Sequence, residues 1–353
     1  MEKTSQQHIK WENTRSVFRA IAAAEEGGVS RAQIAEQTGL SLMTIGKIAD
    51  ELDALGIVAQ QKDERITAGR TARLISCVPD WHILVLDLTA VNFRLFILDL
   101  SLRVLDEITY PYDEMMFCDE NLVMFFKNIS MYRRTKIDIQ FCIGAAVLLP
   151  GAYDAAADRI YGCRLPAFAP LRPKAVLHHL IPAPQIIYIE DVRAAAMSAR
   201  LQGIEQKEDG STLWLSLDHP VSGALLVDGR PLLGANNCAG RFGEVTVGTR
   251  FNLNEAMLSL TDQTERAAAL AIALYNLIAV FDPAQILLES RIQVLDDEFM
   301  ASVQARLQQM NHDRMLPLPQ IRTAETELSA AVRGIAQAIC ETWLRRKCIK
   351  KTN

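Results

Sequence analysis

The sequence lacks the cysteine patterns that mark disulfide frameworks and metal sites. Its seven cysteines are odd in number, and none forms a CxC or CxxC pair. The chain also lacks an apolar run of the ~20 residues that a membrane span needs. Its opening, MEKTSQQHIK, is too polar for a signal peptide. We therefore expect a cytoplasmic protein whose thiols are free and hold no metal.

An excess of positive charge is missing as well. The formal net charge of the 353 residues is −5, and the first 76 residues carry ten Lys/Arg against ten Asp/Glu. Bulk attraction to nucleic acid is therefore absent, and a DNA contact would need charge sorted by face. The length allows two or three domains, and a hydrophobic share of 50% is ordinary for a globular chain.

The most informative stretch that is present runs from Ser30 to Val58. Ser30 and Gln33 form the sequence pattern of a capping box, and Gly39 predicts the end of that first helix. Ser41 can cap a second helix that Gly56 ends. The apolar residues of the second helix recur in steps of three and four, which predicts one buried stripe: Ile45, Ile48, Ala49, Leu52 and Leu55.

Two short capped helices joined by a glycine-containing turn indicate a helix-turn-helix. The alternative is an ordinary helical hairpin inside a larger fold. In the helix-turn-helix interpretation, the residues off the stripe face a DNA groove. The candidate DNA-binding residues of this stretch are Ser30, Arg31, Ser41, Met43, Thr44 and Lys47.

The flanking segments favour the helix-turn-helix. Residues 11–25 have the periodicity of a helix that would pack behind the other two. After Gly56, the segments IVAQQ, KDERITAGR and ARLISCV follow the pattern strand, polar turn, strand, which predicts a β-wing. Arg70 in this turn could enter an adjacent minor groove, or it could be a solvated loop charge. Residues 1–77 are the expected DNA-binding domain.

The rest of the chain alternates strands and helices, which indicates an α/β body with a mixed sheet in each of two similar halves. We expect a first lobe over residues 78–195, closed by a C-terminal helix at 325–345, and a second lobe over 196–324. The other predicted elements are strands at 81–88, 91–98, 104–108, 137–149, 186–189, 212–217, 223–227 and 285–288, and helices at 119–132, 266–281 and 296–310.

The order of the pieces resembles the ROK family of bacterial sugar kinases and sugar-responsive repressors. The family motifs have counterparts in order: GRTA at 69–72, a hairpin DLTAVNFRLFILDL at 87–100, PG at 150–151, EDVRAAA with Asp191 in the place of the kinases' catalytic base, DGRPLLGANNCAGRFGE at 228–244 and DPAQILLES at 282–290. The resemblance implies a winged helix-turn-helix ahead of a two-lobed, actin-like and ribonuclease H-like body.

Departures from the family motifs argue against an enzyme and against cofactors. The glycines of the phosphate-cradling turn are replaced in Asp87-Leu88-Thr89-Ala90, and the paired glycines after the last core strand read Glu289-Ser290. Bulkier residues fill the space that a phosphate needs. The family's zinc histidine and cysteine loop are missing after Glu244, so neither ATP nor zinc is expected.

The sugar-binding positions are altered in a way that changes their charge. Of the family's hydroxyl-binding set only Asp191 persists, whereas Arg164 and Arg241 replace an asparagine and a glutamate. Arginine only donates hydrogen bonds and favours carboxylate or phosphate. An effector, if one exists, would be anionic and sugar-like; alternatively, Arg241 pairs with Asp191 and closes the cleft. The candidate effector residues are Arg164, Asp191, Arg193, Arg241 and Glu244.

The function that these patterns favour is a DNA-binding transcriptional regulator, a repressor of carbohydrate-related genes. One recognition helix reads too few base pairs for genomic specificity. We therefore expect a homodimer or a dimer of dimers on a palindromic double-stranded operator. The alternatives are an ATP-dependent ROK sugar kinase and a scaffold that meets a protein partner.

Overall fold

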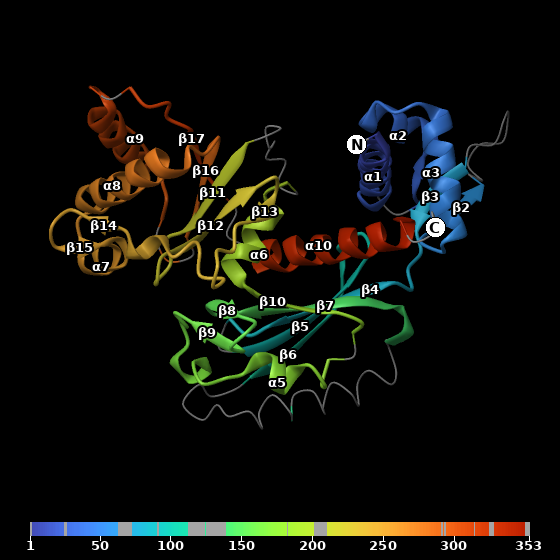
Figure 1. Cartoon of the computed structure of the whole chain (residues 1–353), viewed down its shortest axis with the longest axis horizontal. Helices are drawn as coiled ribbons and strands as arrows, with labels where there is room; N and C mark the ends of the chain where they lie inside the picture. Colours follow the sequence, from blue (N-terminus) through green and yellow to red (C-terminus); the bar gives the residue numbers. More distant parts are fainter. Residues whose placement is uncertain are drawn as a thin grey trace.

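Two five-stranded sheets and one three-stranded sheet organise the chain (Figure 1). The computed structural model describes residues 2–24, 27–62, 73–89, 92–111, 124, 139–181, 183–200, 210–290, 292, 294–313, 315–324 and 328–349. We call residues 2–77 the N-terminal unit. The body consists of lobe 1 (residues 78–200), lobe 2 (residues 210–324) and the C-terminal helix α10 (Leu328–Ile349).

The N-terminal unit packs three helices against a small antiparallel sheet of order β1-β3-β2. Its core joins side chains from every element: Val17, Phe18, Ile21, Ile34, Ile45, Leu52 and Ile75 are at most 3% exposed. The two strands after α3 pair antiparallel, which confirms the predicted wing strands. The elements are α1 (Glu2–Ala22), β1 (Val29–Ser30), α2 (Arg31–Thr38), α3 (Leu42–Ala54), β2 (Val58–Lys62) and β3 (Arg73–Cys77).

Helix α2 begins and ends where the sequence predicts. The Ser30 hydroxyl accepts from the backbone N–H of Gln33, and the Gln33 side chain accepts from the backbone N–H of Ser30 at 2.9 Å. These two bonds complete the capping box. Gly39 ends the helix in the left-handed conformation at φ 69°, which a glycine adopts without a Cβ clash.

Helix α3 is also bounded by the predicted residues. Ser41 is the N-cap and accepts from the backbone N–H of Thr44 at 3.2 Å. At the other end, Gly56 donates to the carbonyl of Asp53, and the next N–H donates to the carbonyl of Leu52 at 3.0 Å. These two bonds form a Schellman motif, with Gly56 at φ 66°.

The two lobes have the same topology. In lobe 1 the first strand, β4, pairs antiparallel with β5 and parallel with β7. In lobe 2 the first strand, β11, pairs antiparallel with β12 and parallel with β16. Numbered within each lobe, both sheets read 3-2-1-4-5, which confirms the predicted two-lobed α/β body. The orders are β10-β7-β4-β5-β6 and β13-β12-β11-β16-β17.

The strands of lobe 1 are β4 (His82–Asp87), β5 (Asn92–Asp99), β6 (Val104–Pro111), β7 (Cys142–Leu149) and β10 (Ile186–Glu190), with the hairpin β8 (Ala152–Asp154) and β9 (Arg159–Tyr161) and helices α5 (Pro173–Leu177) and α6 (Asp191–Met197). Lobe 2 holds β11 (Ser211–Ser216), β12 (Ser222–Val227), β13 (Arg230–Pro231), β14 (Thr246–Val247), β15 (Phe251–Asn252), β16 (Gln285–Glu289) and β17 (Gln320–Thr323), with helices α7 (Leu253–Ser259), α8 (Gln263–Phe281) and α9 (Asp297–Asn311).

Several expected boundaries are corrected. Helix α1 begins at Glu2 rather than Trp11 and ends at Ala22. The buried strand expected at 137–149 starts only at Cys142, after a short 3-10 turn. Of the helix expected at 119–132, Met124 alone is described, and it is helical. Helix α8 is long and apolar enough to cross a membrane by composition, but Leu270 and Leu274 are fully buried in the core of lobe 2.

Helix α10 lies between the lobes and the N-terminal unit (Figure 1). It packs on α6 and on strands β7 and β4. At the crossing with α6 the two backbones nearly touch: a Cβ added at Gly334 would lie 2.2 Å from the carbonyl oxygen of Ala194. Glycine is therefore required at residue 334 for this approach.

The outer end of α10 holds the N-terminal unit. Arg19 of α1 donates from Nε to the carboxylate of Glu341 at 2.9 Å. The rings of Trp81 and Trp343 lie 5.0 Å apart, and the Trp81 indole donates to the carbonyl of Gly56 at 2.7 Å. The guanidinium of Arg345 also lies over the ring of Trp11. One apolar core consequently continues from the N-terminal unit through α10 to α6.

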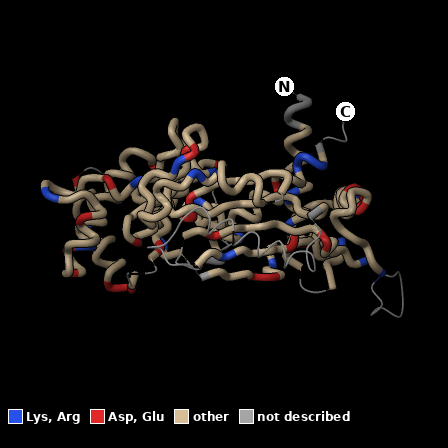
Figure 2. Tube along the Cα trace, turned by 90° about the horizontal axis from the view of Figure 1, so that it is seen from below, with Lys and Arg blue, Asp and Glu red and all other residues tan. Residues whose placement is uncertain are grey.

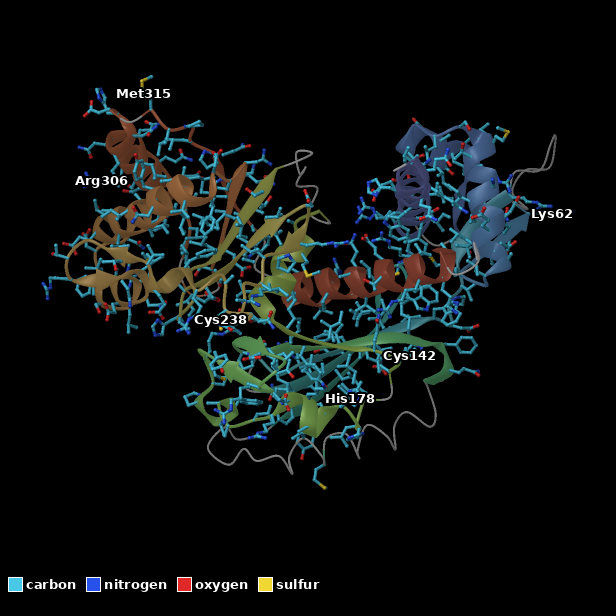
Figure 3. All side chains as sticks on the ribbon, in the orientation of Figure 1. Lys62, Cys142, His178, Cys238, Arg306 and Met315 are labelled. Carbon is cyan, nitrogen blue, oxygen red and sulfur yellow. The ribbon has the colours of Figure 1, made fainter. Side chains whose placement is uncertain are left out.

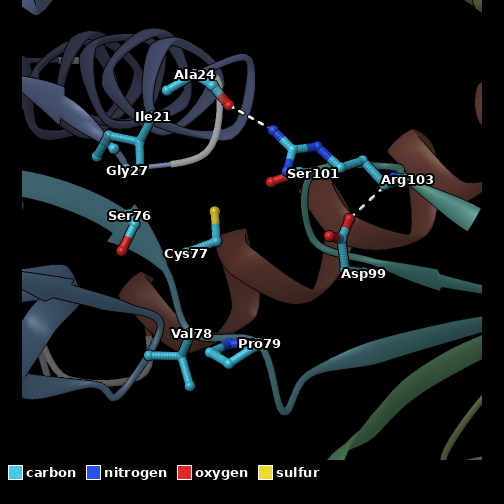
Figure 4. Close-up of a pocket in the computed structure, with 11 residues that line it drawn as sticks. Ile21, Ala24, Gly27, Ser76, Cys77, Val78, Pro79, Asp99, Ser101 and Arg103 are labelled. Carbon is cyan, nitrogen blue, oxygen red and sulfur yellow. Dashed lines mark hydrogen bonds between the residues drawn. The ribbon is translucent and has the colours of Figure 1, made fainter. Parts of the chain in front are cut away.

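The turn between β5 and β6 makes a second attachment (Figure 4). Arg103 donates from Nη2 to the carbonyl of Ala24 at 2.8 Å, and its backbone N–H donates to the carboxylate of Asp99 at 2.9 Å. Beside these bonds lies a cavity of about 170 Å³ that the side chain of Cys77 helps to line. The N-terminal unit is thus held by both α10 and lobe 1.

Candidate nucleic-acid interface and interlobe charge cluster

The first turn and outer face of α3 are open to solvent. Four residues of the predicted stripe, Ile45, Ile48, Ala49 and Leu52, are at most 5% exposed, and the fifth, Leu55, is half-buried against the same core. Met43 is 84% exposed, Lys47 is exposed, and Thr44 is half-buried. The structure therefore brings Ser41, Met43, Thr44 and Lys47 together on one solvent-facing surface, as a groove-reading helix requires.

The hydroxyls at the start of α3 are engaged within the unit. The Oγ of Ser41 accepts from the backbone of Thr44 and lies 2.9 Å from the Oγ1 of the same residue. Ser30 is similarly engaged with Gln33 through the capping box of α2. Both serines shape the interface by fixing where the helices begin.

Arg31 ties three elements of the N-terminal unit together. Its Nη2 donates to the carboxylate of Asp50 on α3 and to the side-chain oxygen of Gln60 on β2, each at 2.9 Å. A Cβ at Gly46 would lie 2.7 Å from Nη1 of Arg31, so a glycine at residue 46 makes room for the guanidinium. Sequence reasoning missed Asp50 and Gln60 because their partner lies 19 and 29 residues away.

The wing presents two basic residues that sequence reasoning did not single out. Lys62, the last residue of β2, pairs in register with Arg73, the first residue of β3, and both are exposed. Figure 3 shows Lys62 pointing away from the N-terminal unit at its outer edge. Arg70 lies outside the described residues. Elsewhere, acidic and basic residues are interspersed along the described trace (Figure 2), and Lys62 and Arg73 form a local basic pair on the wing.

The interlobe charge cluster forms at the carboxyl ends of the core strands. Asp87 ends β4, Asp191 follows β10, and Asp218 lies beyond the end of β11. All three are at most 6% exposed. Ligands of open α/β sheets bind at these strand ends. The placement of the cluster therefore follows from the topology of both lobes.

Arg164 and Asp191 form a buried ion pair in this cluster. The Nη2 of Arg164 lies 2.5 Å from Oδ2 of Asp191, and the two side chains are 11% and 7% exposed. Burial opposes the charge of Arg164, but the carboxylates of Asp191, Glu190 and Asp218 together outweigh it and raise the pKa of the guanidinium above its ordinary value. The ion-pair partner of Asp191 is therefore Arg164, and the alternative in which Arg241 pairs with Asp191 is wrong about this partner.

Arg241 lies in a different environment. It forms an ion pair with Glu244 at 3.2 Å, and both side chains are about half exposed, at 49% and 52%. A Cβ at Gly162 would lie 3.7 Å from the Cζ of Arg241, so the guanidinium borders the loop after β9. Among the predicted effector residues, this pair remains accessible to solvent.

Arg193 joins lobe 1 to the loop before Arg241. Its Nη2 donates to the carbonyl oxygens of Asn237 at 2.6 Å and Ala239 at 2.7 Å, and its Nε lies 3.4 Å from the carboxylate of Glu190. Arg193 is 3% exposed. These contacts occupy its guanidinium with protein groups.

Glu190 and Arg193 also border a groove of about 640 Å³ between α1, α10, β10 and the turn before β13. Arg164, Asp191, Arg241 and Glu244 do not line it. The structure thus separates the five predicted effector residues into the groove-lining Arg193, the buried pair Arg164 and Asp191, and the solvent-facing pair Arg241 and Glu244.

The turn that corresponds to the kinases' phosphate cradle is also filled from within. Oδ1 of Asp87 accepts from the backbone and hydroxyl of Thr89 at 2.8 and 2.6 Å, and Oδ2 accepts from Arg94 at 2.8 Å. Burial raises the pKa of Asp87, opposed by these bonds. In lobe 2, Asp218 accepts from Ser290 at 3.2 Å, so a buried carboxylate lies beside a residue that replaces one of the family's paired glycines.

The described residues contain no group of three His, Cys, Asp or Glu arranged to hold a metal ion. The six described cysteines are free thiols; Cys118 lies outside the described residues. Burial raises the pKa of Cys77 to about 12 and raises that of Cys340 as well. Both of these thiols are therefore poor nucleophiles at neutral pH.

We expect Glu190→Gln to stabilise the protein in a pH-dependent way. Burial raises the pKa of Glu190 from 4.5 to about 6, opposed by Arg193. Between these values the folded state binds more protons than the unfolded state, so stability falls as the pH rises through this window. Above pH ~6 the free energy of unfolding of the variant should be up to about 2 kcal/mol higher than that of the wild type. Below the unfolded pKa the difference should vanish; a pH-independent difference in urea unfolding would contradict the assignment.

The sequence is similar to known transcriptional regulators. It is 25% identical over 247 residues to the DNA-binding transcriptional dual regulator NagC of Escherichia coli K12 and to the N-acetylglucosamine repressor of Shigella flexneri. The match covers 68% of this chain and 58% of each relative, so the chain aligns with less than two thirds of their length. No protein-family model matches the sequence.

Solved structures share the fold. The crystal structure of a ROK family transcriptional regulator, a homolog of the E. coli MLC protein, has a TM-score of 0.67 at 18% identity and covers 97% of this chain and 100% of its own. The ROK hexokinase of Thermus thermophilus has a TM-score of 0.57 at 16% identity and covers 72% and 97%. The structure therefore has the ROK fold, and the N-terminal unit is included in the match to the regulator.

Proposed function

We propose that this chain, which has the ROK fold and is homologous to NagC-type repressors, is a cytoplasmic DNA-binding repressor of carbohydrate-related genes. The observation that carries the proposal is the capped helix α3, which presents Met43 and Lys47 to solvent beside a basic wing. We assign residues 1–77 to DNA binding and the body, which consists of lobe 1, lobe 2 and α10, to dimerisation.

In the proposed complex, α3 enters the major groove and the wing follows the adjacent backbone. Lys47 contacts the groove or its phosphates, and Arg70 enters the minor groove. Ser30 and Ser41 hold the helix ends, and Arg31 braces α3 against β2 while half-exposed near the DNA. Because each copy offers one recognition helix, two copies related by a two-fold axis bind a palindromic operator, with the body as the dimer interface.

The body acts without turnover in this proposal. Asp191, at the position of the kinases' catalytic base, is neutralised by Arg164, and Asp87 is occupied by Thr89 and Arg94. These contacts favour the closed cleft over an open sugar site. An anionic sugar-like effector would then reach only Arg241, in competition with Glu244. The ROK kinases share the fold, which does not fix the function.

The test is selection of bound fragments from the source genome with purified protein, followed by affinity measurements on the selected operator. Lys47→Ala and Arg70→Ala should each weaken specific binding by about fivefold or more. Lys47→Ala should also lower the salt dependence of binding. Lys174→Ala, an exposed lysine on α5, is the matched control and should have no effect.

Two outcomes would contradict this proposal. One is that no fragment is enriched, or that both variants bind the operator within about twofold of the wild type. The other is phosphoryl transfer from ATP to a sugar in a coupled assay, which would support the kinase alternative.

A further inference from the structure

The start of α3 carries two large apolar side chains in water. Leu42 is 57% exposed and Met43 is 84% exposed. They are the first two residues of the helix, directly after the N-cap Ser41. Single exposed apolar residues are common on protein surfaces. An adjacent pair at the end of a recognition helix is different, because those positions contact base edges.

The polar groups nearest to this pair are engaged within the N-terminal unit. The hydroxyls of Ser41 and Thr44 are 2.9 Å apart, and Ser41 also caps the helix. Arg31 is held by Asp50 and Gln60. At the first turn of α3 the side chains that project furthest into solvent are therefore apolar. A base contact there depends on apolar chemistry more than on hydrogen bonds.

The major groove offers one apolar group that distinguishes bases, the C5-methyl of thymine. A methionine side chain is flexible and polarizable, so it can adapt to a methyl group at the groove edge. We infer that Met43 and Leu42 read thymine methyl groups, so that each operator half-site carries thymine beneath the first turn of α3. The inference rests on the proposed function and names the bases that this helix recognises.

The test replaces thymine by deoxyuridine, one position at a time, in the operator selected from the genome. Deoxyuridine keeps every hydrogen-bonding group of thymine and removes only the methyl. At one or two positions in each half-site the wild type should lose about fourfold in affinity, the value of one buried methyl-sized group. Met43→Ala should weaken binding to the thymine operator and should be insensitive to deoxyuridine at its own position.

The matched controls lie on the same helix. Lys47→Ala should bind more weakly but retain the full sensitivity to deoxyuridine, and Thr44→Ala should weaken binding less than Met43→Ala. Because Met43 is exposed, its variant should melt at the wild-type temperature, so a loss of affinity is not a loss of fold.

The inference is overturned if the wild type binds every deoxyuridine operator as tightly as the thymine operator. It is also overturned if Met43→Ala and Leu42→Ala both keep the wild-type pattern of sensitivity. In either case a specific operator has still been bound, so the proposed function stands. If no operator is bound at all, the proposed function itself fails.

Discussion

Replacing Asp191 by alanine is expected to destabilise the body by about 3–5 kcal/mol, the cost of leaving a buried charge without its partner. Arg164 would lose the carboxylate at 2.5 Å while remaining 11% exposed. The measurement is urea unfolding followed by circular dichroism. Because the loss comes from the unpaired guanidinium, Asp191→Asn should be intermediate.

Two comparisons separate this cause from a general loss of packing. The double variant Arg164→Leu/Asp191→Leu should recover most of the stability, because neither member of the pair is left buried without the other. Arg241→Ala removes an arginine from a half-exposed pair with Glu244 and should cost less than about 1 kcal/mol. A single Asp191→Ala variant as stable as Arg241→Ala would show that Arg164 reaches water.

Replacing Gly334 by valine is expected to separate α10 from α6. Even the first side-chain carbon would lie 2.2 Å from the carbonyl oxygen of Ala194 and 2.8 Å from the backbone nitrogen of Ser198. Both contacts are backbone atoms, which cannot rotate away. We expect the free energy of unfolding, measured in urea, to fall by about 1–3 kcal/mol or more, because the added side chain overpacks the helix crossing. Gly334→Ala should lie at the lower end of this range.

The same substitution should also weaken operator binding, although residue 334 is remote from α3. Helix α10 contacts the N-terminal unit through Glu341 and packs on Trp81 through Trp343, so displacing the helix should move the two recognition helices of the proposed dimer out of register. Arg333→Ala, on the exposed face of the same helix, is the control and should change neither property. Wild-type stability in Gly334→Val would mean that α10 and α6 cross differently.

Features encoded in neighbouring residues could be predicted from the sequence. Ser30 with Gln33, Ser41, and Gly39 are local signals, because each cap is satisfied within a few residues. The buried stripe of α3 follows from its 3.6-residue period alone. The longer core strands of both lobes could be found because they are continuous apolar runs bounded by turns.

Features that depend on contacts between distant segments could not be predicted. Arg164 meets Asp191 across 27 residues, whereas the only pairing of Asp191 considered from the sequence was the alternative with Arg241. The position of the Arg31 guanidinium depends on the space that Gly46 leaves and on Gln60 in the wing. Strands of two to four residues, such as β14 and β17, are too short to show a period of two.

The attachment of the N-terminal unit to α10 has a spectroscopic consequence. The chain has four tryptophans, and three of them, Trp11, Trp81 and Trp343, lie where α10 meets the N-terminal unit. The fourth, Trp214, is fully buried in lobe 2. The tilted contact between the Trp81 and Trp343 rings, the guanidinium over Trp11 and the hydrogen bond to Gly56 all affect indole emission at this junction. The intrinsic fluorescence of the protein is therefore weighted toward the junction of α10 with the N-terminal unit, and it reports without any label whether that unit is docked on the body.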